Sequence, residues 1–234
     1  MRWLHRRFLP VVLNLAWLLT CAGIATGYPV EWAASLEKLT EEADIVFKGT
    51  AVSSGPVRDK WFKPYQDFVV RETQFKVISV IKGERPGDKL MFRHYDEDPR
   101  PQGRMFQPQY YHFELSRTYL VFAKKGGFAG TFRQLWMYHK TKGDQGVLLC
   151  ADDKPVMGKT VKEVLWNELT TMLVSKDVSD IVYAIGQLDQ MSGGREGFDR
   201  LSDFDRKDVL AAVRGLMANG CNPVLRSEFP VFSR

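Results

Sequence analysis

The hydrophobic period of this chain changes once, between residues 150 and 160, and that change limits the fold more than any other feature. From Ile45 to about Cys150 the apolar residues form short runs rich in Val, Ile, Phe and Tyr, separated by Gly, Pro and Asp. Such runs are typical of β-strands. From Thr160 onward the apolar residues recur at helical spacing. The sequence therefore predicts an α+β protein in which the strands come first and the helices follow.

Five strands are expected in the first segment, after a short helix at about residues 35–43. The strands cover residues 45–52, 68–81, 89–95, 118–124 and 133–139. The second strand has apolar residues on both faces, so it is buried on both sides or bent by a bulge. Residues 82–88 supply the Gly and Pro of the turn that follows it. Five strands in this space favour a small barrel over a large sandwich.

The second segment predicts about three helices. Thr160 and Glu163 have the spacing of a capping box, so a helix should begin there. A second apolar stripe follows a break at residues 175–177 and should end at residues 192–194, and Ser202 and Asp205 suggest the cap of a third helix. The three stripes are Val161, Val164, Leu165, Leu169, Met172 and Leu173; Val178, Ile181, Ala184, Ile185, Leu188 and Met191; and Val209, Leu210, Val213, Leu216 and Met217.

The first 27 residues have the layout of a secretory signal. Three Arg side chains precede an apolar run at residues 8–21, and the run ends in small residues. The run is shorter than the roughly 20 apolar residues of a membrane-spanning helix. Small side chains at Ala25 and Gly27 predict cleavage between Gly27 and Tyr28. An uncleaved anchor, a twin-arginine signal and a lipoprotein attached through Cys21 are the alternatives.

These boundaries predict a signal peptide at residues 1–27, a strand domain at residues 28–151 that folds alone, and a helical segment at residues 160–234 that does not. Without the signal, 30 Lys and Arg face 28 Asp and Glu. A nearly neutral chain gives no support for a nucleic-acid partner, which would need a concentrated basic patch. Cys150 and Cys221 would remain, either as one disulfide or as two separate thiols.

Three stretches of the strand segment carry a resemblance to a known class of domain. They are residues 43–49 (Ala-Asp-Ile-Val-Phe-Lys-Gly), residues 75–83 together with Gly87 and Asp88, and residues 119–123 (Tyr-Leu-Val-Phe-Ala). They resemble a recurring secreted bacterial domain that is similar to the barrel of tissue inhibitors of metalloproteinases (TIMP-like) and netrin modules. The resemblance implies a five-stranded Greek-key barrel of the oligonucleotide/oligosaccharide-binding (OB) type. It does not imply inhibition, because those inhibitors begin with a cysteine and this mature chain would begin at Tyr28.

The helical segment resembles the start of a HEAT-type array of stacked helix pairs. One such unit cannot cover its own outer face. Either the helices dock on the barrel, or a longer array continues from them.

The candidate site residues form two groups. His94, Asp96, His112 and Glu114 are metal-ligand types without the spacing of a known metal site, so no metal, cofactor or catalytic residue is predicted. The second group could stack on bases or sugar rings, although core packing weighs more for such aromatics. Its members are Arg93, Tyr95, Tyr110, Tyr111 and Phe113.

The sequence favours an exported, secreted or periplasmic, non-enzymatic binding or interaction module, without a stable membrane span once mature. Its partner would be an unknown protein or a carbohydrate. A protease inhibitor acting through the barrel and an uncharacterised metal-dependent enzyme are the alternatives.

Overall fold

The structure, a computed structural model, describes residues 34–58, 68–97, 109–127, 130–135, 146–193 and 203–218. The chain divides into two compact units, residues 1–31 and 32–234, and every described residue belongs to the second. Cys21, the expected cleavage site at Gly27 and Tyr28, and Cys221 lie outside the described residues. The described part is α+β, as the sequence predicts.

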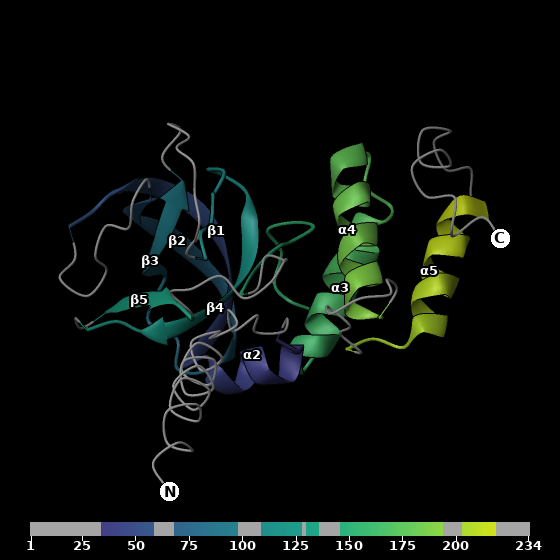
Figure 1. The fold of residues 1–234 in the computed structure, drawn as a ribbon, viewed down its shortest axis with the longest axis horizontal. Helices are drawn as coiled ribbons and strands as arrows, with labels where there is room; N and C mark the ends of the chain where they lie inside the picture. The colour runs from purple at the N-terminus through teal and green to yellow at the C-terminus, as the bar shows by residue number, and fades with distance from the viewer. Residues whose placement is uncertain are drawn as a thin grey trace, which may run out of the picture. The chain divides into compact units, whose positions relative to one another are not determined.

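Six strands pair into one sheet within the described residues (Figure 1). They are β1 (Ile45–Pro56), β2 (Phe68–Lys82), β3 (Lys89–Glu97), β4 (Thr118–Lys125), β5 (Thr131–Gln134) and β6 (Val147–Leu149). Their order is β1-β2-β3-β5-β4-β6, and β1 also pairs with β4. The first five strands therefore form a closed ring. The β3–β5 pairing is parallel and the other pairings are antiparallel.

The long strands bend where their register shifts. The β1–β2 pairing has three register shifts, between residues 46 and 53 of β1. Such irregularities increase the local twist and bend, which lets one strand pair with a neighbour on each side. After β2 the chain turns at Gly83, whose φ is +86°. A Cβ there would lie 2.5 Å from the carbonyl oxygen of Asp44, so only glycine fits this turn.

Four helices are present in the described residues: α2 (Leu36–Glu42), α3 (Val161–Met172), α4 (Val178–Met191) and α5 (Arg206–Ala218). The capping box at the start of α3 is confirmed, because Thr160 accepts from the amide of Glu163 and the Glu163 carboxylate accepts from the amide of Thr160. Asp205 accepts from the amide of Lys207 at 2.7 Å, as a residue that caps α5 would. Ser192 ends α4.

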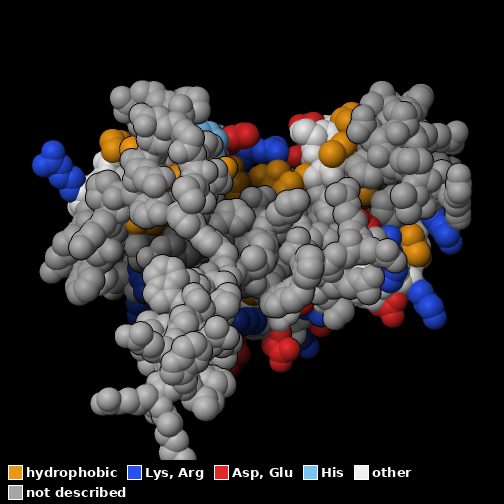
Figure 2. All heavy atoms as spheres, in the orientation of Figure 1, with side chains coloured by type: hydrophobic (Ala, Val, Ile, Leu, Met, Phe, Trp, Pro, Cys, Tyr) orange, Lys and Arg blue, Asp and Glu red, His pale blue; other side chains and the backbone are white. Residues whose placement is uncertain are grey.

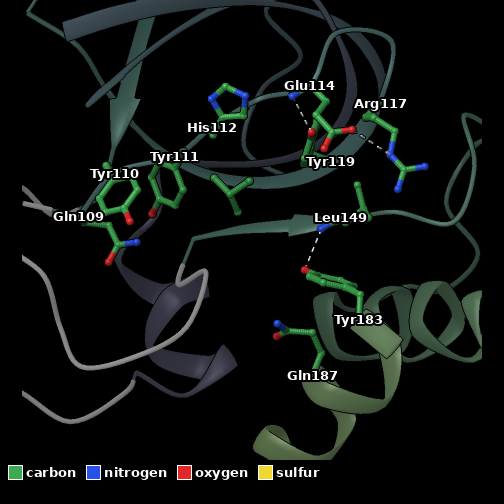
Figure 3. A pocket seen from close by; sticks show the side chains of 11 residues that line it. Gln109, Tyr110, Tyr111, His112, Glu114, Arg117, Tyr119, Leu149, Tyr183 and Gln187 are labelled. Atoms are coloured by element: carbon green, nitrogen blue, oxygen red, sulfur yellow. Dashed lines mark hydrogen bonds and ion pairs between the residues drawn. The ribbon is translucent and has the colours of Figure 1, made fainter. Parts of the chain in front are cut away.

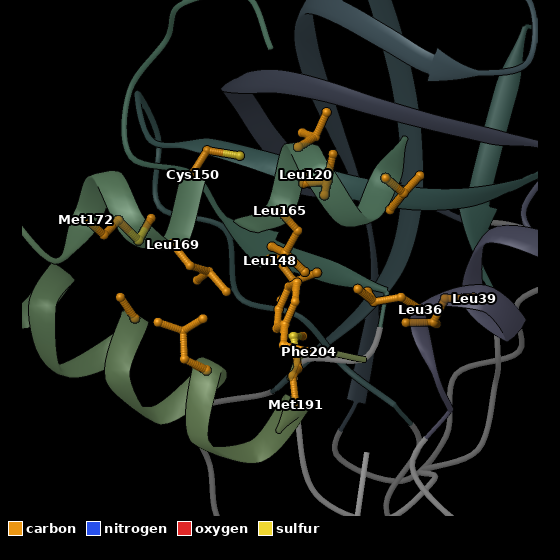
Figure 4. Close-up of a cluster of buried hydrophobic side chains, with 14 of the residues drawn as sticks. Leu36, Leu39, Leu120, Leu148, Cys150, Leu165, Leu169, Met172, Met191 and Phe204 are labelled. Carbon is orange, nitrogen blue, oxygen red and sulfur yellow. The ribbon is translucent and has the colours of Figure 1, made fainter. Parts of the chain in front are cut away.

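Side chains of the strands alternate between two hydrophobic clusters. The inner cluster fills the ring and includes Phe47, Phe75 and Phe92, each less than 1% exposed. The shared cluster contains side chains of β1, β4 and β6 that point away from the inner cluster, together with side chains of all four helices. Figure 4 shows Leu120 and Leu148 from the sheet beside Leu165 and Leu169 from α3.

The expected boundary between strand domain and helical segment falls in the connection from β6 to α3. The shared cluster has members on both sides of it: Val46, Leu120, Phe122 and Leu148 from the sheet, and Val164, Leu165, Leu169 and others from the helices. The helices thus cover apolar sheet residues that would otherwise face water.

The strands follow the sequence prediction except near the end of the sheet. β5 begins at Thr131, before the expected start at 133, and residues 136–139 of that expected strand lie outside the described part. β6 was not predicted.

None of the helices within the described ranges combines the length and apolar character that crossing a bilayer requires.

Candidate functional site

A cavity of about 430 Å³ lies where the segment before β4 meets β6 and α4. Its wall is rich in tyrosine and in hydrogen-bonding side chains: Gln109, Tyr110, Tyr111, His112, Glu114, Arg117, Tyr119, Val147, Leu149, Tyr183 and Gln187. Figure 3 shows Tyr110 and Tyr111 on one side of it and Tyr183 and Gln187, from α4, on the other. This volume is within the range of small-ligand pockets, roughly 300–1,000 Å³.

A buried glutamine holds the first wall of this cavity in place. Gln134 of β5 is fully buried, and its side-chain amide donates to the carbonyl of Gln109 at 2.7 Å and accepts from the amide of Tyr95 at 2.8 Å. Tyr95 and Tyr110 also form a parallel β-bridge, and the amide of Tyr111 donates to the carbonyl of Tyr95. The segment that carries the tyrosines is therefore fixed to β3.

Arg117 joins the strand ring to α4 beside the cavity. Its Nη2 lies 2.8 Å from Oδ1 of Asp180, and its Nε lies 3.9 Å from Oε2 of Glu114. The hydrogen bond to Asp180 outweighs partial burial and raises the pKa of Arg117. The guanidinium charge is thus already matched by two carboxylates.

The hydroxyls of two wall tyrosines accept hydrogen bonds from backbone amides. Tyr183 Oη accepts from the amide of Leu149, and Tyr119 Oη accepts from the amide of Glu114, both at 3.0 Å. A phenol tied at its hydroxyl has a fixed ring orientation. Tyr183 is half-buried against the shared cluster, and the rest of its side chain remains open to a ligand.

Gln109 carries an unsatisfied acceptor at the cavity wall. Its side chain is 4% exposed, and its amide oxygen is buried without a hydrogen-bond partner in the structure. A buried acceptor without a partner costs about 1–3 kcal/mol.

The sequence-predicted aromatic group divides between the core and the cavity. Tyr95 packs with Phe68 and Val70, and Phe113 lies in the inner cluster. Arg93 pairs with Glu72 across the β2–β3 ladder at 2.7 Å. Of the five residues, only Tyr110 and Tyr111 line the cavity, and Tyr111 is 4% exposed.

The residues near His94 that could ligate a metal form hydrogen bonds and ion pairs with other side chains and with the backbone. His94 is fully buried, with Nε2 2.8 Å from Thr73 Oγ1 and Nδ1 3.0 Å from the carbonyl oxygen of Tyr95. A carbonyl only accepts, so Nδ1 carries the proton of the neutral ring. Asp96 pairs with Arg71 at 2.9 Å and lies 3.4 Å from His112. Within the described ranges, no three His, Cys, Asp or Glu side chains are grouped as a metal site requires.

Sequence reasoning missed the α4 side of the cavity. Tyr183 and Gln187 are one helical turn apart, so they lie on one face of α4. The spacing of Tyr183 and Gln187 beside the apolar stripe of α4 could have indicated this wall of the cavity. Polar side chains next to an apolar stripe are, however, ordinary helix surface, so the spacing alone does not predict a site.

On the face drawn in Figure 2, the Lys and Arg side chains of the described residues stand apart, and acidic side chains lie near several of them. Among the described side chains visible on that face, there is no gathered basic patch of the kind that binds a phosphate backbone.

No protein family model matches this chain, and no curated protein sequence matches it either.

Proposed function

We propose that this chain is an exported, non-enzymatic binding module whose ligand site is the cavity between the strand ring and α4. The observation that carries the proposal is the wall of this cavity, which is rich in tyrosine and in hydrogen-bonding side chains. A concave site with a few placed polar groups is the usual form of a small-ligand site. The hydroxyl of Thr73 and Nε2 of His94 are in contact at 2.8 Å, but both side chains are fully buried, out of reach of a substrate, which favours binding over catalysis.

The strand ring supports the finer part of the proposal, an OB-type barrel similar to that of TIMP and netrin modules. The β1–β4 pairing closes the ring, and closure removes exposed sheet edges. The resemblance of α3 and α4 to a HEAT-type pair stays part of the same proposal. In it the helices dock on the barrel and provide one wall of the site.

The test is to incubate the secreted protein with a mixed extract of small metabolites and glycans, wash it, and identify retained molecules by mass spectrometry. Gln187→Trp should abolish retention, because an indole at this half-exposed position fills the cavity. Val182→Trp is the matched control, since Val182 lies on the exposed face of α4 and does not line the cavity. Equal retention by both variants, or no retained molecule at all, would refute the site.

A further inference from the structure

We infer that the cavity takes a neutral, polyhydroxylated ligand, a sugar, whose ring packs on Tyr183 and whose hydroxyls meet the side-chain amide of Gln187. This inference rests on the proposed function, because it names the ligand class of the same site. Charge, aromatic geometry and hydrogen-bonding capacity each point to that class.

The charges of the wall are already balanced. Arg117 is paired with Asp180 at 2.8 Å, and Glu114 lies near its Nε at 3.9 Å. A phosphate or carboxylate ligand would have to compete with Asp180 for the guanidinium. A quaternary ammonium ligand would meet the positive charge of Arg117. A neutral ligand disturbs neither carboxylate pairing.

The aromatic side chains suit the faces of a sugar ring. Tyr110 stands across the cavity from Tyr183 (Figure 3), whereas Tyr111 beside it is 4% exposed and packs in the inner cluster. The faces of these rings carry partial negative charge, and the C–H bonds on a sugar face are apolar with slightly positive hydrogens. Because the Tyr183 hydroxyl is held by the amide of Leu149, the ring need not reorient when a ligand packs on it.

The side-chain amide of Gln187 suits hydroxyl groups. A side-chain amide donates and accepts, as a hydroxyl does, so one glutamine can bond two neighbouring hydroxyls. Gln187 brings a half-buried amide from the α4 wall, whereas the amide oxygen of Gln109 is fully buried and takes no part in binding.

The experiment is isothermal titration of the secreted protein with maltose, cellobiose and N-acetylglucosamine disaccharide as neutral probes, and with choline and inorganic phosphate as charged probes. We expect saturable binding of at least one neutral probe and none of the charged ones. Tyr183→Ala should weaken binding roughly tenfold or more, since it removes the aromatic face on which the sugar ring packs. Tyr183→Phe keeps the ring and should stay within about threefold of the wild type.

Two further variants guard against a folding defect in Tyr183→Ala. Gln187→Ala changes a half-exposed side chain and should weaken the neutral probe, whereas Val182→Ala should not. Cavity-dependent binding of choline or phosphate alone would overturn the sugar inference and leave the proposed binding function standing. Failure of all probes would overturn the sugar inference, and failure of the extract screen as well would overturn the binding function.

Discussion

Lys48 on β1 donates a hydrogen bond of 2.6 Å from Nζ to Oε1 of Glu168 on α3, across 120 residues of sequence. The two side chains are 1% and 8% exposed, and Asp152 adds a second carboxylate 3.1 Å from the same Nζ. Burial alone would lower the pKa of Lys48, but the hydrogen bonds and charges of these carboxylates raise it overall. The other Glu168 oxygen accepts from the amide of Ala151. This group fastens the first helix of the helical segment to the strand ring.

Removing the cation should therefore destabilise the whole described unit. In Lys48→Met, two carboxylates remain near each other without their partner, and we expect a loss of about 3–5 kcal/mol in the free energy of unfolding. Adding Glu168→Gln should recover part of that loss, because a neutral amide can still accept from Ala151. Urea unfolding at pH 7 measures both. A loss below about 1 kcal/mol for the single variant would show that the buried pair contributes little.

The strand segment should be unstable without the helices. A fragment of residues 28–151 would expose Val46, Leu120, Phe122 and Leu148, which are at most 2% exposed in the intact structure. We expect this fragment to aggregate or to unfold at a much lower urea concentration than the full chain. The sequence alone predicts the opposite, that the segment folds by itself, and the fragment's stability decides between the two predictions. A soluble monomer that unfolds cooperatively at the urea midpoint of the full chain would contradict the prediction of instability.

Stability should fall in acid because of His94. Burial is the main cause that lowers the pKa of His94 to about 4, whereas the unfolded chain binds the proton below about pH 6.5. The stability that neutral His94 contributes is fully present above about pH 6.5. As the pH falls toward 4 this stability is lost, and the free energy of unfolding decreases by about 3 kcal/mol in all. Urea unfolding at several pH values should show a smaller loss for His94→Gln than for the wild type. Parallel curves for the two proteins would mean that other groups cause the acid effect.

The sequence predicts those parts of the structure that depend on residues close together in the chain. The ends of β2 and the capping box of α3 were predictable, because alternation and capping depend on neighbouring residues. β6 has three residues, too few for a pattern. The Lys48–Glu168 pair depends on how the helices dock on the sheet, which no local spacing encodes. The same docking places Tyr183 across the cavity from Tyr110. The unpredicted half of the candidate site is for that reason its α4 half.

Export should release a chain that begins at Tyr28 or within a few residues of it. The short apolar run and the small residues that end it are the basis of this prediction. Intact-mass spectrometry of the protein from a secreting host measures the new N-terminus. A lipid-modified chain beginning at Cys21 would instead place the protein on a membrane surface.

The most direct measurement of the central claim is a chemical-shift map of the labelled, secreted protein with the molecule retained from the extract. The account predicts shifts in three stretches that are distant in sequence and adjacent in the cavity: residues 109–119, 147–149 and 183–187. These shifts should disappear in Gln187→Trp and persist in Val182→Trp. Shifts confined to β2 and β3, or spread without relation to the cavity, would contradict the claim that this cavity is the ligand site.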